Sequence, residues 1–245
     1  MNPQLVVVLV EPSGPLNIGS VARLCANFET GPLRLVSPRC DATGEQARLM
    51  AVHAAERLQT CKRFETLEAA VADCRRVVAC SGRIEAQERD HLEPAPALQW
   101  LMQAIPGPPR VALVFGREDH GLHNSELQLA GRLLRIPTAQ SYSSMNLSHA
   151  VAVCLAALPL PQESEAAARS EALPAQGALE AALKDAEALL LEVGFLYPHT
   201  AEARMAKLRQ LLLRAEPQEG EVALLRGMVR QLRWASRHGG TEQGQ

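Results

Sequence analysis

The residues best suited to ligand chemistry gather in one loop near the middle of the chain. Between an apolar run at Leu133–Ile136 and an apolar helical pattern that starts at Asn146, the chain reads PTAQSYSSM. Hydroxyl groups, backbone amides and one aromatic ring are concentrated there. A loop at the carboxyl end of a strand in an α/β sheet is where ligands usually bind. We therefore interpret Ile136–Leu147 as a cofactor-binding loop.

A helix is expected directly after this loop. Asn146 suits the N-cap position, because its side-chain oxygen can accept hydrogen bonds from amides of the first turn. Behind it, apolar residues recur at helical spacing, namely Leu147, Val151, Cys154, Leu155 and Leu158. One face of this helix is therefore predicted to be apolar.

A second loop with polar residues follows the first predicted strand. The sequence predicts a turn there and then a helix capped by Asn17 or Ser20. Gly14 and Gly19 do not have the spacing of GxGxxG, and no P-loop motif is present, so a nucleotide-binding Rossmann protein is not indicated. Arg23, on this helix, could reach back toward the loop or could be a solvated surface residue.

The rest of the first 158 residues alternates strands with helices. Short apolar runs predict strands at Leu5–Val10, Leu33–Val36, Cys61–Phe64, Val77–Ser81, Val111–Phe115 and Leu133–Ile136. Further helices are predicted at Glu45–Arg57, at Thr66–Asp73, at Ala97–Ala104 and after a cap at Asn124 or Ser125. About five βα repeats indicate an α/β domain with a mostly parallel sheet covered on both faces.

The composition changes after Leu158. Residues 159–177 are rich in Pro, Glu, Ser and Ala with little apolar periodicity, so we predict a linker. Helices are predicted beyond it at Ala178–Val193, from Thr200 onward and at Glu219–Arg237. The sequence thus predicts a first domain at 1–158, a small helical domain at 178–238 and a disordered tail at 239–245.

The last predicted helix carries a stripe of arginines beside its apolar face. These residues are Arg226, Arg230, Arg233 and Arg237. From Thr200 to Arg237, eight lysines and arginines stand against four glutamates, whereas the whole chain has a formal charge of −2. Such a stripe suits contacts with nucleic-acid phosphates, although a solvated helix face is the alternative.

Composition narrows the remaining classes of function. The longest apolar runs are too short to span a bilayer and no signal-peptide pattern is present, so we expect no membrane association and a cytoplasmic location. The six cysteines form no CxxC pair, and we expect reduced thiols. His120 and His123 have no third ligand nearby, so we expect no metal.

Three segments, in order, resemble the motifs of a known enzyme family. NIGSVAR (17–23), VFGREDHGLHNSEL (114–127) and IPTAQSYSSMNLSHAV (136–151) are similar to the three motifs of the SpoU-like branch of SPOUT RNA methyltransferases. GFLYP (194–198) and LLRGMVRQ (224–231) resemble segments of its TrmJ group, which 2′-O-methylates a pyrimidine at position 32 of the tRNA anticodon loop. The resemblance covers nearly the whole chain.

The resemblance implies a fold and a cofactor. The first domain would have the SPOUT α/β fold, with a parallel sheet and a C-terminal trefoil knot, one of the few exceptions to unknotted topology. S-adenosylmethionine would lie in the knot of each subunit of a homodimer. The residues that would bind it are Cys80, Ser81, Gly82, Gly116, Ile136, Ser143, Ser144, Met145 and Leu147.

The resemblance also implies roles in methyl transfer. Arg23 of one subunit would approach the cofactor of the other and orient the ribose hydroxyl, because a guanidinium with a pKa above about 12 is a poor base. Asn17 would hold the loop before Arg23, and Glu118 would position Arg23 or the RNA. Ser144 and Asn146 would line the cofactor loop. These five residues form the predicted catalytic set.

Two other functions remain open. The same chemistry could act on ribosomal RNA, because an arginine stripe does not distinguish classes of RNA. The chain could also be a knotted RNA-binding protein without catalysis, although a pure binder has no need for Asn17, Arg23, Glu118 and Asn146 together.

Overall fold

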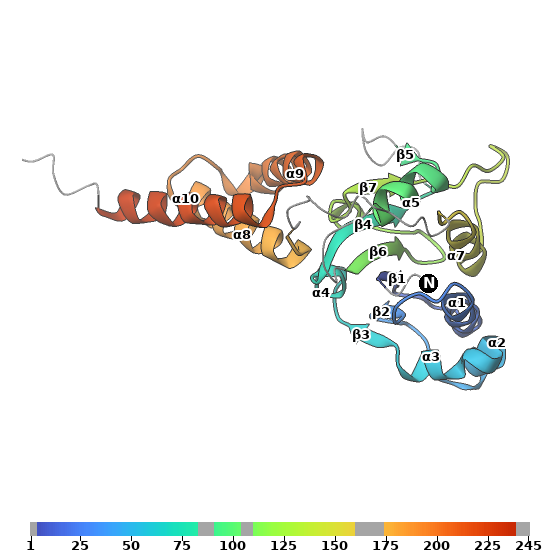
Figure 1. Cartoon of the computed structure of the whole chain (residues 1–245). Helices are drawn as coiled ribbons and strands as arrows, with labels where there is room; N and C mark the ends of the chain where they lie inside the picture. Colours follow the sequence, from blue (N-terminus) through green and yellow to red (C-terminus); the bar gives the residue numbers. More distant parts are fainter. Residues whose placement is uncertain (1–3, 83–90, 104–109, 160–173, 239–245) are drawn as a thin grey trace, which may run out of the picture. The chain divides into compact units, whose positions relative to one another are not determined.

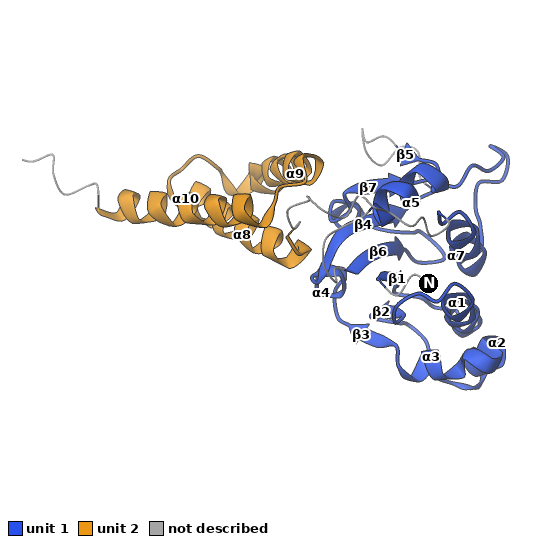
Figure 2. Cartoon of the chain, in the orientation of Figure 1, with its two compact units in different colours: residues 1–170 blue, residues 171–245 orange. Residues whose placement is uncertain are grey.

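The computed structural model describes residues 4–82, 91–103, 110–159 and 174–238. The chain divides into two compact units, residues 1–170 and residues 171–245 (Figure 2). Most of the predicted linker and all of the predicted tail at 239–245 lie outside the described residues. No helix within the described ranges is long and apolar enough to cross a membrane.

The first unit is built on a seven-stranded sheet (Figure 1). In spatial order its strands are β3 (Lys62–Phe64), β2 (Arg34–Val36), β1 (Leu5–Val10), β6 (Arg110–Phe115), β4 (Cys74–Cys80), β7 (Arg132–Leu134) and β5 (His91–Leu92). Every pair of neighbouring strands is parallel. The predicted α/β fold with a parallel sheet is therefore confirmed, whereas the knot stays a prediction.

Strand β1 shows why this sheet is buried on both faces. Leu5, Val7 and Leu9 belong to one hydrophobic cluster, whereas Val6 and Val8 belong to the other. Successive side chains of a strand point to opposite faces of the sheet. An uninterrupted apolar run is therefore what a central strand with two covered faces requires.

Helices cover both faces of the sheet. The first cluster is packed by α1 (Pro15–Asn27), α5 (Pro94–Met102) and α7 (Leu147–Ala156). The second cluster is packed by α4 (Leu67–Val71) and by the segment around α6 (Asn124–Leu127). On the first face α1 contacts α7, so the family segments 17–23 and 136–151 become neighbours.

Helix α1 also packs closely against α2 (Glu45–Ala51). A Cβ atom at Gly19 would lie 2.1 Å from the carbonyl oxygen of Ala47, so only glycine fits there. Gly19 therefore allows two helices to pack closely. This role agrees with the absence of GxGxxG spacing, because the glycine is not needed to bind a dinucleotide.

The predictions for α1 and for the helix that includes α2 need correction. Helix α1 begins at Pro15, so neither Asn17 nor Ser20 is its cap. Proline suits the first helical position, where its missing N–H would have no partner in the helix. The helix predicted over Glu45–Arg57 is interrupted by a 3-10 turn at Val52–Ala54 and continues as α3 (Ala55–Gln59).

Within residues 174–238, the second unit consists of three helices: α8 (Gln176–Glu192), α9 (Pro198–Ala215) and α10 (Glu219–His238). Their small core includes Leu183, Met205 and Val222. The carboxylate of Glu180, which is 3% exposed, accepts from Arg209 at 2.9 Å. This ion pair joins α8 to α9.

Three details of the second unit differ from the prediction. Helix α8 begins at Gln176, inside the predicted linker. Helix α9 begins at Pro198, before the predicted cap Thr200, whose hydroxyl donates to the carbonyl of Tyr197. The apolar side of α10, predicted from helical spacing, is only partly buried: Val222 is 3% exposed, whereas Leu232 is 57% exposed.

Candidate functional site

A cavity of about 350 Å³ lies at the carboxyl ends of β4, β6 and β7. Small-molecule sites typically measure about 300–1,000 Å³. All nine residues predicted to bind the cofactor line it, namely Cys80, Ser81, Gly82, Gly116, Ile136, Ser143, Ser144, Met145 and Leu147. These residues come from three separate parts of the chain, 80–82, 116 and 136–147, and the fold brings them to one place.

The loop from Gly116 to Gly121 folds back on itself beside the cavity. Arg117 and Gly121 exchange two backbone hydrogen bonds, of 3.2 and 3.0 Å. A Cβ atom at Gly116 would lie 2.2 Å from the carbonyl carbon of Gly121. Glycine is therefore required at position 116 for the loop to close.

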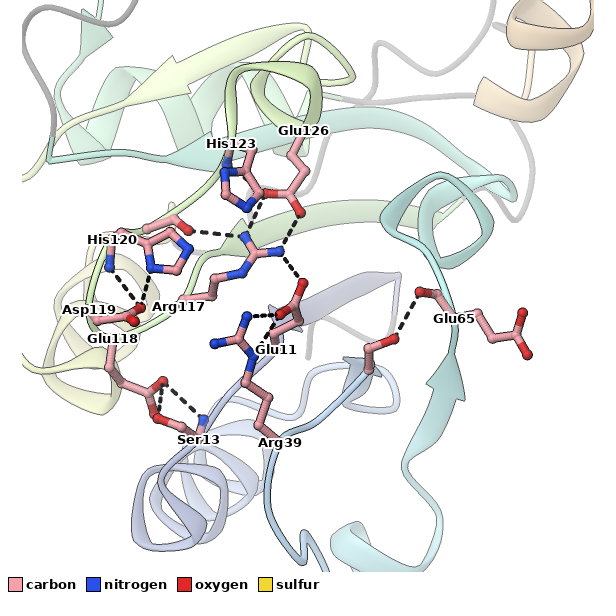
Figure 3. Close-up of polar contacts among 12 residues, drawn as sticks. Glu11, Ser13, Arg39, Glu65, Arg117, Glu118, Asp119, His120, His123 and Glu126 are labelled. Carbon is pink, nitrogen blue, oxygen red and sulfur yellow. Dashed lines mark hydrogen bonds and ion pairs between the residues drawn. The ribbon is translucent and has the colours of Figure 1, made fainter.

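The side chain of Arg117 anchors this loop to β1 and α6. It is 3% exposed, and its terminal nitrogens donate to Glu126 at 2.9 and 3.0 Å. Arg117 also donates to Glu11, just after β1, and Arg39 donates to the same carboxylate at 2.7 Å (Figure 3). The bond from Arg117, with help from Arg39 and against the effect of burial, lowers the pKa of Glu11 to about 2.

Glu126 also determines where α6 begins. Its carboxylate accepts from the backbone N–H of His123 at 2.7 Å, and His123 is the N-cap residue. The predicted caps at Asn124 and Ser125 are therefore wrong, because the cap lies just before them.

Glu118 binds the start of α1. Its carboxylate accepts from the N–H groups of Ser13 and Gly14, both at 3.0 Å, and from the amide of Asn17 at 3.1 Å (Figure 3 draws the contacts with Ser13). The helix dipole favours an anion in this position. Burial would raise the pKa of Glu118, but these donors hold it below its ordinary value. Within the described residues, Glu118 thus holds the helix that carries Arg23 and not Arg23 itself.

Asn17 and Asn146 extend this contact to α7. The oxygen of the Asn17 side chain accepts from the Asn146 amide nitrogen at 3.0 Å. The Asn146 oxygen accepts from the N–H groups of Ser148 and His149 at 2.9 and 3.3 Å, which confirms Asn146 as the predicted N-cap. We call this the Glu118–Asn17–Asn146 chain. It joins the three family segments, 17–23, 114–127 and 136–151.

Arg23 lies apart from the cavity of its own subunit. It is exposed on α1 and is not one of the described residues that line the cavity. Of the other predicted catalytic residues, Glu118 and Ser144 line the cavity, whereas Asn17 and Asn146 support it through the hydrogen-bonded chain. One subunit therefore assembles the predicted cofactor residues without the arginine.

The sequence analysis did not single out every residue of the cavity wall. Phe115, Arg117, Asp119, His120, Gly121, Thr138 and Ala150 also line it. The Asp119 carboxylate and His120 Nδ1 lie 2.6 Å apart. The charged run 117–120, between Gly116 and Gly121, is the sequence signal that could have indicated Arg117, Asp119 and His120. Among the residues that the structure describes, no group of three His, Cys, Asp or Glu could hold a metal ion.

The arginine stripe lies on α10, and α8 partly neutralises it. The four arginines predicted to bind RNA are Arg226, Arg230, Arg233 and Arg237. Arg226 lies 3.5 Å from the Asp185 carboxylate, and Arg237 lies 2.9 Å from that of Glu192. Arg233 donates to the carbonyl of Asp185 at 2.8 Å. These contacts hold three of the arginines in place, and Arg230 is exposed.

Two family models match the chain. Residues 4–156 match the SpoU rRNA Methylase family, and residues 178–243 match the C-terminal domain of the tRNA methyltransferase TrmJ. The first match alone covers more than half of the chain. The chain belongs to the SpoU methylase family.

Similar proteins support the assignment of this chain to the SpoU methylase family, and some match it over most of its length. It is 34% identical over 228 residues to the tRNA (cytidine/uridine-2′-O-)-methyltransferase TrmJ of Pectobacterium atrosepticum, with 91% of this chain and 94% of the relative covered. It is 38% identical over 149 residues to the tRNA (cytidine-2′-O-)-methyltransferase TrmJ of Methanocaldococcus jannaschii, with 61% of this chain and 64% of the relative covered.

The fold is also that of a solved relative. The crystal structure of TrmJ from Z. mobilis ZM4 matches this SpoU methylase with a TM-score of 0.81 and 30% identity, covering 93% of this chain and 98% of the other. The match includes the helical C-terminal region, so the predicted resemblance to the TrmJ group is confirmed.

Proposed function

We propose that this SpoU methylase transfers a methyl group from S-adenosylmethionine to the 2′-hydroxyl of a pyrimidine ribose in tRNA. The observation that carries the proposal is one cavity lined by two of the family segments, 114–127 and 136–151, with all nine expected cofactor residues in its wall. The third family segment, 17–23, is joined to that wall by the hydrogen bond from Asn17 to Glu118. Relatives named as tRNA 2′-O-methyltransferases, matched over 91% of this chain, support the same reaction.

The cavity offers charged and apolar contacts to the cofactor. Arg117, Glu118 and Asp119 lie in its wall, and Ile136 and Met145 offer apolar contacts. S-adenosylmethionine, when bound, supplies a methyl group on a positively charged sulfonium that is already an activated leaving group. The acidic side chains would stabilise that charge, and the strand-end loops would hold the rest of the molecule. The proposed chemistry includes no metal.

A homodimer would supply the arginine that one cavity lacks. Helix α1 packs against α2 and α7, and exposed apolar side chains on these helices would form the surface between two subunits. They include Leu16, Leu49, Met50 and Val153. In a dimer paired through this face, Arg23 of one subunit would approach the cofactor of the other.

The proposed role of Arg23 follows from its chemistry. A guanidinium with a pKa above about 12 does not take up the hydroxyl proton at neutral pH. It would instead orient the ribose hydroxyl and stabilise the negative charge that develops on the oxygen. In-line placement of oxygen, methyl carbon and sulfur would contribute much of the remaining acceleration.

The C-terminal unit favours tRNA over ribosomal RNA. Residues 178–243 match the TrmJ C-terminal domain model. The resemblance to the TrmJ group implies position 32 of the anticodon loop, which we propose as the target. Contacts between phosphates and arginines would add to the affinity, led by Arg230, with Arg226, Arg233 and Arg237 held beside it by α8.

A transfer assay with labelled cofactor tests the reaction and its substrate. Unmodified tRNA and ribosomal RNA transcripts are incubated with wild type, Arg23→Ala and Arg23→Lys. We expect tRNA to be labelled at position 32, and both variants to be slower by a factor of at least about 100, because lysine lacks the planar fork of arginine. Labelling of ribosomal RNA alone would contradict the tRNA proposal. Binding without any labelling would favour a non-catalytic RNA-binding protein.

Mixed dimers test whether Arg23 acts between subunits. Arg23→Ala subunits keep the cavity, and Gly116→Val subunits keep Arg23 but have a cavity loop that cannot close. If Arg23 serves the partner's cavity, mixing two inactive variants should restore about a quarter of wild-type activity, since half of the dimers contain one complete site. Continued inactivity after subunit exchange would indicate that Arg23 acts within its own subunit.

A further inference from the structure

Exposed aromatic rings stand out in the turn between α8 and α9. The chain has only four Phe, two Tyr and two Trp residues. Two of these eight, Phe195 and Tyr197, lie in this turn and are 62% and 56% exposed. Large apolar side chains that are exposed close together mark interaction sites more often than scattered ones do.

The turn holds both rings outward. Leu196, between them, is 3% exposed in the core of the bundle, and its N–H donates to the carbonyl of Leu190 at 2.9 Å. Gly194 has a φ of +76°, and the Tyr197 carbonyl accepts from the N–H of Thr200 at 2.9 Å. Burying either ring in this core would require breaking these contacts. The exposure is therefore a property of the folded turn.

Positive charge lies beside the rings. Arg204 donates to the Phe195 carbonyl at 3.2 Å, and Lys207 is exposed on the same helix. The Tyr197 ring stacks on that of His199, with centroids 6.0 Å apart and an angle of 22° between planes. Proteins bind unpaired nucleotides with this combination, in which aromatic faces stack on bases and cations contact phosphates.

We propose that Phe195 and Tyr197 form a stacking site for unpaired bases of the tRNA substrate, next to a phosphate contact by Arg204. The inference rests on the proposed function for its partner, and it adds a base contact on the helical unit, outside the cofactor cavity. A second copy of the chain could also cover exposed rings. The neighbouring Arg204 and Lys207 favour a polyanion instead.

Binding of the full-length protein to an anticodon stem-loop tests this site. The RNA carries 2-aminopurine in its loop, and a fully paired duplex of equal length serves as the control ligand. Phe195→Leu and Tyr197→Leu keep apolar volume but remove the aromatic face. Each should weaken stem-loop binding by about tenfold and reduce the change in 2-aminopurine fluorescence, with little effect on duplex binding.

Matched variants separate stacking from folding. Val193, in the same turn, is 49% exposed without a ring, so Val193→Ala should bind like wild type. Phe195→Tyr keeps an aromatic face and should retain stem-loop affinity. A loss of affinity in Val193→Ala or Phe195→Tyr equal to that of the leucine variants would overturn the proposal.

Two further results would also overturn it. One is unchanged stem-loop affinity in the double leucine variant. The other is a change in molecular mass on sedimentation of that variant, because the rings would then join two copies of the chain. The transfer assay keeps the two proposals apart. Wild type that binds the stem-loop through the rings but methylates nothing contradicts the proposed function alone, and methylation with unaffected leucine variants contradicts the stacking site alone.

Discussion

Replacing Asn17 by aspartate tests the Glu118–Asn17–Asn146 chain. The substitution keeps the shape of the side chain but converts the donor that lies 3.1 Å from Glu118 Oε1 into an acceptor. Above pH 7 two carboxylates would face each other at a partly buried position. The bond from Asn146 to the other side-chain oxygen, 3.0 Å long in wild type, can persist.

The expected cost depends on pH. Two unit charges about 4 Å apart repel by about 4 kcal/mol at an effective dielectric constant near 20, which corresponds to about 3 pKa units. The folded variant should therefore keep one proton on the pair up to about pH 7, whereas both carboxyls ionise near pH 4 when the chain is unfolded. A pKa that folding raises favours the folded state at low pH, and this contribution is lost as pH rises through the folded pKa. Asn17→Asp should thus be within about 1 kcal/mol of wild type at pH 5 and about 3–4 kcal/mol less stable at pH 8.

Unfolding by heat and by denaturant at pH 5 and pH 8 measures this difference. For a unit of this size, the pH 8 value corresponds to a melting temperature about 10 °C lower. Asn17→Ala is the matched control, since it loses both hydrogen bonds, at about 1 kcal/mol each, without adding a charge. Equal destabilisation of the two variants at both pH values would refute the reasoning, because an introduced carboxylate that faces Glu118 must respond to pH.

Two further predictions concern the loops around the cavity. The pKa of Glu11 is about 2 in the folded protein against an ordinary 4.5, so its contribution to stability, about 3 kcal/mol, should be lost as pH falls from 4.5 toward 2. Acid unfolding of Glu11→Gln should accordingly be less steep than that of wild type. Gly116→Ala should abolish cofactor binding in calorimetry, because its Cβ would lie 2.2 Å from the opposite side of the loop. Gly227→Ala, whose Cβ meets nothing within 4 Å, should bind normally and gain about 0.5–1 kcal/mol of stability.

Local patterns were sufficient to predict most of the sheet and the start of α7. The run Leu5–Val10 is apolar at every position, and only a strand covered on both faces buries every side chain of such a run. At Asn146 the cap and the apolar spacing behind it depend on residues within a few positions. These features depend on residues that are close together in the sequence, so each can be predicted from one segment alone.

Contacts between distant segments could not be predicted in the same way. The preference of asparagine for the N-cap position predicted Asn17 as a cap. In the folded chain its amide instead binds Glu118, 101 positions away, and Pro15 begins the helix. The helical spacing of the arginine stripe could be seen in the sequence. Its carboxylate partners, Asp185 and Glu192, belong to a different helix, more than 40 positions earlier in the chain. The charged partners of a side chain depend on tertiary packing, which helical spacing alone does not encode.

The position of Asn17 on α1 also explains why Arg23 is absent from its own cavity. Asn17 binds Glu118 and Asn146, so its side of the helix faces the cavity loops. Arg23 follows six residues later, which is about 9 Å along the axis and about 240° around it. The contacts that hold the start of α1 against the cavity therefore direct Arg23 away from it. Our proposal that this guanidinium meets a methyl donor across an interface between subunits agrees with that direction, so the mixed-dimer experiment tests a consequence of helix geometry as well as of family resemblance.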